Sequence, residues 1–451
     1  MQTLKINKFL LIVVNPSLLL FGVLVFYYFP TMLLSLFSIF WIMTACALIL
    51  VFTRAGNCHL ANAHHATTRL PWQPWICSII LIELALIGGY LGISALCGNF
   101  FTVNTTTHAA LFETSLTLFS LHYGLFPWSL YALIAAGMAY TAYHDETDAY
   151  LSNLLKPFFS IEPHSFYGLI ANVGMRRCVV FSISILFVFT ALLLTHFLLP
   201  LNIHIAHGFD TSAIVVSLSI FALSYSDSIK KYLIKLFSRN IPTTLSFPLF
   251  CTALGAICII LTLFSNGLYK NTAAEPPALA IQWIQYNWQT AWIIFSVLWF
   301  LCLTPLICPV IARLSKGYRA REVIIGVLAF PLLLALFFIL KNTLSLNVTL
   351  TPFLITLLSV IALLVLMPLL INHHHFSSTM MAYLPKNGLH KNRDTHSFII
   401  EFVRITAVAL FLYLTIGMNG LALFLFAPNF LSILTLPLTA IAVVKHLLER
   451  S

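Results

Sequence analysis

The chain has 451 residues, of which 60% are hydrophobic and only 8% charged, and its formal net charge is +10. This composition excludes a water-soluble protein with an ordinary charged surface, so lipid must surround most of the chain. The nine cysteines lie mostly inside apolar runs without a CxxC pair, which argues against a zinc site and a disulfide framework. We therefore expect no metal or other cofactor.

Uncharged apolar runs recur along the whole chain. A bilayer core of about 30 Å needs roughly 20 apolar residues per helix, and runs without strict alternation exclude a β-barrel. The sequence predicts an all-α membrane protein with a single domain over 1–451. In chain order, the twelve predicted transmembrane helices cover residues 9–29, 31–53, 75–97, 111–143, 178–200, 212–226, 246–266, 290–312, 323–340, 351–371, 398–418 and 420–444.

Basic residues fall in alternate loops between these helices. One set of loops holds 20 of the 23 Lys and Arg residues, whereas the opposite set holds only Lys270 and Lys341, and Arg404 lies inside a helix. Basic residues favour the cytoplasmic face, so we expect both termini in the cytoplasm of a bacterial cell and the helices in its inner membrane. This topology also explains the positive net charge, and no nucleic-acid partner is expected.

Two segments carry patterns specific to one family. Residues 121–145 read LHYGLFPWSLYALIAAGMAYTAYHD, and residues 292–322 read WIIFSVLWFLCLTPLICPVIARLSKGYRARE, with Thr304 and Pro305 ahead of Arg313. These segments resemble the fourth and eighth helices of the betaine/choline/carnitine transporter family. The fourth helix of that family runs His-Trp-Gly-Leu-His-x-Trp-x-x-Tyr-Ala. Its eighth helix is tryptophan-rich and continues through Ser-Pro to Ala-Arg-Ile-Ser-Arg-Gly-Arg. Weaker likenesses extend over nearly the whole chain.

The resemblance implies a LeuT-like fold of two five-helix inverted repeats. Two peripheral helices (1–53) precede the first repeat (75–266) and the second repeat (290–444). Family members carry quaternary ammonium compounds by alternating access, with the site at mid-membrane between the repeats. The resemblance also implies a homotrimer.

An aromatic cage is the substrate site that the resemblance implies. A trimethylammonium group has no N–H to donate, so its main strong attraction is to the faces of aromatic rings. The family positions correspond to Tyr123, Trp128 and Tyr131 in the fourth helix and to Trp299 and Phe300 in the eighth. Tyr123 and Phe300 stand where tryptophan is usual, and Leu303 replaces a third tryptophan. The alternative is ordinary aromatic packing, since the chain has 38 Phe.

Glu83 is an ionisable residue within the third predicted helix. A charge at mid-bilayer costs at least about 2.5 kcal/mol unless it is paired or hydrated. We expect Glu83 either to pair with a cationic substrate or to carry a proton, and the alternative is a hydrogen bond to a neighbouring helix. Gly88, Gly89 and Gly92 follow it, close to where the family has an unwound glycine stretch. If the helix opens there, its carbonyls could face the site.

Asn372 and His373 are further candidates for coupling to an ion. They occupy two positions where sodium-coupled members of the family have Thr and Ser. Imidazole is a poor sodium ligand and titrates near neutral pH, so proton coupling or ion-free exchange is favoured over sodium coupling. The alternative is that His373, His374 and His375 form a solvated helix end.

Two functions from different classes therefore remain. The first is secondary active transport of a small quaternary-ammonium or related amine compound of the choline, betaine and carnitine class. The second is a transport-inactive membrane sensor or structural protein that retains the fold, which the loss of cage rings favours. An enzyme is not expected, because the sequence has no Ser/His/Asp arrangement, HExxH motif or phosphate-binding glycine loop.

Overall fold

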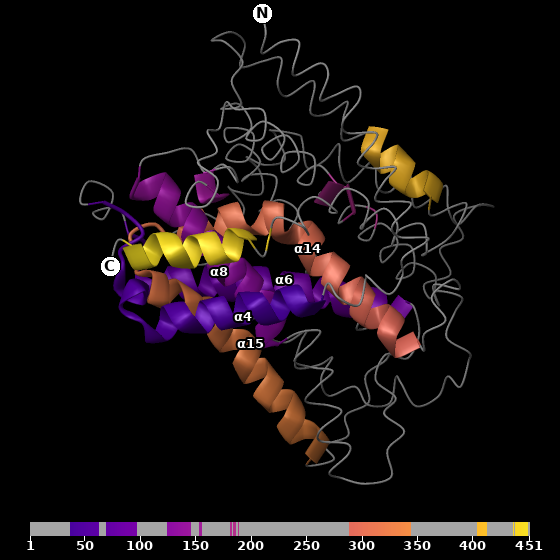
Figure 1. The fold of residues 1–451 in the computed structure, drawn as a ribbon. Coiled ribbons are helices and arrows are strands. Elements are labelled where there is room, and N and C mark those ends of the chain that lie inside the picture. Colours follow the sequence, from indigo (N-terminus) through magenta and orange to yellow (C-terminus); the bar gives the residue numbers. More distant parts are fainter. Residues whose placement is uncertain are drawn as a thin grey trace, which may run out of the picture.

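The computed structural model describes residues 37–62, 69–96, 124–145, 288–343, 404–412 and 438–449, with short helical pieces at 153–155, 181–182, 184–185, 188 and 436. These residues are predominantly helical (Figure 1). The long helices are α4 (Phe37–Phe52), α6 (Trp72–Leu96), α8 (Leu125–Tyr143), α14 (Trp288–Leu314) and α15 (Ala320–Thr343), and a 3-10 helix, η2 (Arg54–Asn57), follows α4.

Helix α8 lies at the centre of this arrangement. Every residue from Pro127 to Thr141 is buried, as expected for a helix that is apolar on all sides. Helices α4, α14 and α15 all contact it. The hydroxyls of Thr44 in α4 and Ser129 in α8 share a hydrogen bond of 2.8 Å. Each hydroxyl also lies within hydrogen-bond distance of a carbonyl of its own helix, Phe40 for Thr44 and Phe126 for Ser129, so the pair links the two helices at a point that both backbones hold in place.

Helices α6, α14 and α15 agree with the predicted spans to within a few residues. Helix α8 ends at Tyr143, the predicted end of the fourth span, but it begins at Leu125 after the non-helical Gly124, so the prediction of one continuous helix from residue 111 is wrong. Leu125–Tyr143 and Ser296–Leu314 are long and apolar enough to cross a bilayer, and Ser38–Phe52 is a shorter apolar helix. The predicted first, sixth, seventh and tenth spans lie outside the described residues.

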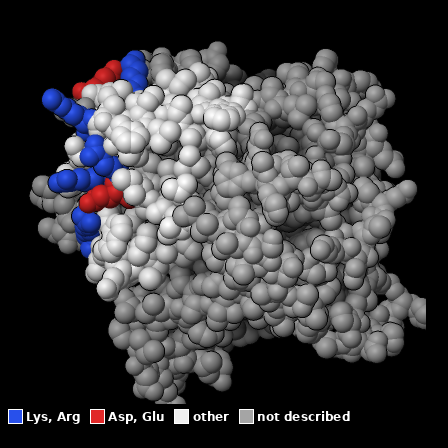
Figure 2. Space-filling view, turned by 90° about the horizontal axis from the view of Figure 1, so that it is seen from below, with Lys and Arg blue, Asp and Glu red and all other residues white. Residues whose placement is uncertain are grey.

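Several helix ends meet at one end of the structure. His59, after η2, forms an isolated antiparallel bridge with Arg319, before α15. Arg321 donates a hydrogen bond of 3.0 Å to the carbonyl of Thr53, and Arg69 pairs with Glu322 at 3.6 Å. In the view of Figure 2, the Lys and Arg side chains gather along one edge. Loops 54–69 and 313–321 therefore lie on the same side, as their basic residues predict.

An aromatic cluster holds the start of α6 against this end. The ring of Trp75 is fully buried, stacks on Tyr318 at a centroid distance of 4.4 Å and donates from Nε1 to Ser315 Oγ at 3.1 Å. Arg69 lies 3.9 Å from the centroid of the Tyr318 ring, within the range of a cation–π contact. The indole packs against α15 at Gly326, where no larger residue fits, because a Cβ there would lie 2.2 Å from Cη2 of Trp75.

Candidate functional site

Aromatic rings from α8 and α14 meet in the centre of the structure. Trp128 and Tyr131 are three residues apart on α8, so they share a face, and their ring centroids are 5.3 Å apart. Phe300 of α14 lies 6.0 Å from Trp128 and 5.9 Å from Tyr131. All three side chains are fully buried. We call Trp128, Tyr131 and Phe300 the ring cluster.

Trp299, the fourth predicted ring that the structure describes, is also fully buried. It precedes Phe300 by one residue, and one residue turns an α-helix by about 100°. The two side chains therefore leave α14 in different directions. Phe300 contacts both Trp128 and Tyr131, so this ring brings α14 against α8.

The ring cluster contains two polar donors, of which one has a hydrogen-bond partner and the other has none in the described part of the chain. The Tyr131 hydroxyl donates to the carbonyl of Phe300 at 2.9 Å, and this bond ties α8 to α14. Nε1 of Trp128 is buried and has no hydrogen-bond partner in the described part of the chain. A buried donor without a partner costs about 1 to 3 kcal/mol. Such an atom identifies a place where a ligand oxygen would be stabilising.

Two prolines interrupt the backbone hydrogen-bond ladder of helix α14 close to the ring cluster. Pro305 and Pro309 lie inside this helix, and each lacks the N–H that would bond the carbonyl four residues earlier. Side-chain donors gather in the same turns: Thr304 donates to the Phe300 carbonyl at 2.9 Å, and Ser182 donates to the Cys302 carbonyl. Because Pro305 removes the helical bond to the carbonyl of Leu301, this turn is a natural place for α14 to bend.

Glu83 lies in α6 with an exposed fraction of 0%. Both of its carboxyl oxygens are buried without a hydrogen-bond partner among the described residues. The alternative of a hydrogen bond to a neighbouring helix is therefore not found within that part of the chain. Helix α6 contacts α14 and α15, so this carboxyl group belongs to the same helical assembly as the ring cluster.

The glycines that follow Glu83 do not open the helix. Residues Gly88, Gly89 and Gly92 all lie within α6, which runs unbroken from Trp72 to Leu96. The conditional expectation of unwound carbonyls at this point is not met, because the backbone keeps its helical hydrogen bonds through the glycines. Three other predicted site residues, Tyr123, Asn372 and His373, lie outside the described residues.

Sequence reasoning missed two groups of contacts. The first is the set of hydroxyl and thiol donors around α14, including Cys308, whose thiol lies 3.8 Å from the Tyr131 carbonyl. Pro305 and Pro309 give no signal for these contacts, because they free the carbonyls of residues 301 and 305, which none of these donors binds. The second is the contact between Asp145 and His446, at 2.9 Å. The two residues are so distant in sequence that no local pattern joins them.

Comparisons with known proteins find sequence similarity to one family of transporters. The family model for betaine/carnitine/choline family transporters matches residues 24–351. The osmo-dependent choline transporter of Acinetobacter baylyi is 26% identical over 317 residues, which cover 67% of this chain and 44% of that protein. The glycine betaine transporter of Bacillus subtilis is 23% identical over 240 residues, or 49% of this chain and 44% of that protein.

A third relative is the high-affinity choline transport protein of Escherichia coli, which is 24% identical over 219 residues. The match covers 48% of this chain and 32% of the relative. The chain thus spans about half or less of the length of these three relatives.

Proposed function

This chain belongs to the betaine/carnitine/choline family of transporters, and we propose that it carries a small quaternary-ammonium or related amine compound across the membrane by secondary active transport. Family members are transporters and not enzymes, and the chain is a multi-pass helical membrane protein. The observation that carries the proposal is the ring cluster, in which α8 and α14 supply buried aromatic rings to one place.

The chemistry of the ring cluster suits this substrate class. A cation–π contact in a dry site is worth up to about 2 kcal/mol per ring. Choline, betaine and carnitine each combine a trimethylammonium group with an oxygen acceptor. The N–H of Trp128, which lacks a partner within the described ranges, suits that oxygen. Tyr123 and Trp299 are proposed as further members of the substrate site.

Substrate access requires the ring cluster to open. Trp128 and Tyr131 contact each other and Phe300 directly, so a trimethylammonium group can be received only when these rings move apart. The turn around Pro305 provides a place where α14 can bend. Alternating access between two inverted repeats supplies such a movement, and we include it in the proposal.

The proposed architecture follows the family. It has twelve transmembrane helices, with two five-helix inverted repeats (75–266 and 290–444) after the two helices of 1–53. The basic end shown in Figure 2 faces the cytoplasm of a bacterial cell, since short basic loops are retained on that side. The protein assembles as a homotrimer in the inner membrane.

We assign the coupling of transport to Glu83, Asn372 and His373. Transport is coupled to a proton or proceeds by exchange without an ion, and it is not coupled to sodium. Glu83 supports this assignment, because a buried carboxyl group without a partner within the described ranges is stabilised either by a proton or by a substrate cation.

Uptake into proteoliposomes tests the function and the coupling together. Labelled choline, betaine and carnitine should be presented with a sodium gradient, with a pH gradient, or with internal substrate for exchange. We expect accumulation or exchange of at least one compound without a requirement for sodium. If a pH gradient drives uptake, Glu83→Gln should abolish that accumulation, because glutamine cannot be protonated. Strict sodium dependence would contradict the coupling assignment.

A second candidate function is a transport-inactive sensor or structural protein. The direct contacts within the ring cluster and the replacement of a cage ring by Leu303, which is fully buried, favour it. Absence of both uptake and exchange for all three compounds, in protein that remains folded, would support this second function over the first.

A further inference from the structure

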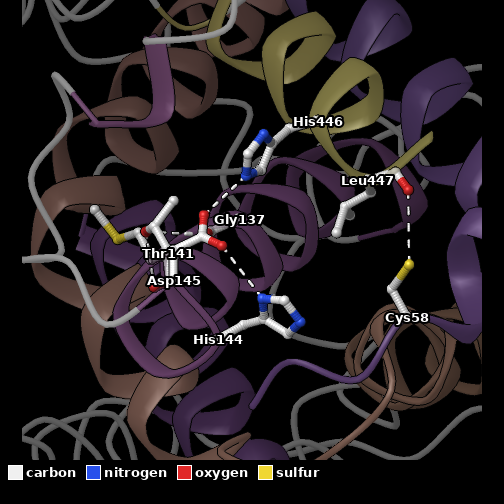
Figure 3. A network of polar contacts seen from close by, with 8 residues as sticks. Cys58, Gly137, Thr141, His144, Asp145, His446 and Leu447 are labelled. Carbon is white, nitrogen blue, oxygen red and sulfur yellow. Dashed lines mark hydrogen bonds and ion pairs between the residues drawn. The ribbon is translucent and has the colours of Figure 1, made fainter. Parts of the chain in front are cut away.

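The indole of Trp128 carries a hydrogen-bond donor that its surroundings leave unused. Trp128 is fully buried, and its Nε1 has no hydrogen-bond partner among the residues that the structure describes. Polar groups at the other end of α8 do find partners: Asp145 lies 2.9 Å from Nε2 of His446 and 3.2 Å from Nδ1 of His144 (Figure 3). Unused buried donors are uncommon in native proteins, so each one calls for an explanation, and a bound ligand is one.

The other donors close to the ring cluster bond to the protein itself. The hydroxyls of Tyr131 and Thr304 both donate to the carbonyl of Phe300, each at 2.9 Å. The thiol of Cys308 lies 3.8 Å from the carbonyl of Tyr131, which suits a weak sulfur donor. Among these four donors, the N–H of Trp128 is therefore the one that a ligand can use without breaking a protein hydrogen bond.

An unused indole N–H selects for one kind of ligand group. It donates a hydrogen bond and cannot accept one, so it recognises the oxygen of a hydroxyl, a carboxylate or a carbonyl group and gains nothing from a hydrocarbon chain. Nε1 is already buried in the free protein. Its removal from water is therefore not a cost of binding, and the bond to a ligand oxygen adds directly to affinity.

The oxygen and the cation of a ligand are recognised by different parts of the ring cluster. An N–H bond lies in the plane of its indole, whereas a trimethylammonium group lies over the face of an aromatic ring. Tyr131 and Phe300, which each meet Trp128 at an interplanar angle of 72°, supply such faces without an N–H in their rings. Recognition of the oxygen can thus be removed from the site while aromatic faces for the cation remain.

We propose that Trp128 is a specificity-determining residue, whose N–H selects quaternary ammonium compounds that carry an acceptor oxygen over those that carry none. The inference rests on the proposed function, because it assigns a selectivity to the proposed substrate site. It narrows the substrate class from amine compounds in general to those with an oxygen on an arm of the ammonium group. A ligand without that oxygen leaves the N–H unpaired in the complex, and sites built around a hydrogen bond reject such analogues.

Two ligands that differ in one group test this selectivity. In n-propyltrimethylammonium, a methyl group replaces the hydroxyl of choline, while the charge stays the same. Equilibrium binding of both compounds to the full chain in lipid nanodiscs gives the ratio of their dissociation constants. We expect choline to bind more tightly than the analogue, although a hydroxyl is more costly than a methyl group to remove from water.

Trp128→Phe removes the N–H and keeps an aromatic ring. The preference for choline over the analogue should fall about tenfold, since a buried donor that loses its acceptor accounts for at least that factor. The smaller ring weakens the contact with the trimethylammonium group of both ligands alike. The change in the ratio between variant and unmodified protein therefore isolates the hydrogen bond to the oxygen.

Trp75→Phe is the matched control. Trp75 is also fully buried, but its Nε1 bonds to Ser315 at the basic end, so this change should leave the ratio as it is in the unmodified protein. An unchanged ratio in Trp128→Phe would overturn the proposal. So would choline that binds no more tightly than the analogue in the unmodified protein, a result that does not depend on the folding of any variant.

These outcomes are distinct from a failure of the proposed function. If choline, betaine or carnitine binds but the ratio shows no selection for the hydroxyl, the transport function stands and the role of Trp128 as a donor is wrong. If none of the three compounds binds, the proposed substrate site is wrong, and the inference is overturned with it.

Discussion

Tyr131 combines two roles that a single substitution can separate. Its ring belongs to the ring cluster, while its hydroxyl ties α8 to α14 through the Phe300 carbonyl. Tyr131→Phe should lower the free energy of unfolding by about 1 kcal/mol, the usual worth of one hydrogen bond, and leave substrate affinity within about threefold, because the ring remains. Thermal unfolding and an uptake KM measure the two effects. A large loss of affinity would mean that the hydroxyl, and not the ring, contacts substrate.

At the residue scale, helical spacing predicts which rings share a face of one helix, but not how rings of two helices meet. Trp128 and Tyr131 share a face because their spacing is helical, and the structure confirms it. Which rings of α14 point toward α8 depends on the rotation of α14 about its axis, which sequence spacing does not determine. Likewise, the burial of Glu83 was predictable from its apolar surroundings, whereas its lack of a partner in the described part of the chain was not.

Helix packing at the start of α6 depends on one glycine. In Gly326→Ala, the new methyl group would overlap the rigid indole of Trp75, which is also held by its bond to Ser315. Overpacking of this kind typically costs about 1 to 3 kcal/mol, so the melting temperature should fall. Adding Trp75→Phe shortens the ring and should recover part of that loss. Additive losses in the double variant would show that the two side chains do not compete for space.

At the scale of elements, the limits of α6, α14 and α15 and the end of α8 were predictable, because about 20 apolar residues between polar ends leave few alternatives. The start of α8 at Leu125 was not, because the apolar run continues upstream of it. The glycines after Glu83 were a weaker signal. Glycine lowers helix propensity by about 1 kcal/mol, but packing against α14 and α15 outweighs that preference, and α6 stays helical. Glycines in a sequence show where a helix can break, but the packing of the helix decides whether the break forms.

At the scale of the whole molecule, charge alternation anticipated that loops 54–69 and 313–321 share one side. Their contacts, including the pair of Arg69 and Glu322, agree. The contact between Asp145 and His446 was not predictable, because the two residues are 301 positions apart in sequence, and only the packing of the assembled helices brings them together. The proposed transport function depends on the same long-range packing, since it requires α8 and α14 to share one site.

Equilibrium binding of labelled choline, betaine or carnitine to the purified protein tests that shared site most directly. Phe300→Leu removes the α14 ring from the ring cluster, and Phe40→Leu makes the same change at a buried position of α4. For the compound that binds, loss of one desolvated cation–π contact should weaken affinity up to about 30-fold in Phe300→Leu. Phe40→Leu should bind like the unmodified protein. Equal affinities for Phe300→Leu and the unmodified protein would contradict a substrate site built from α8 and α14.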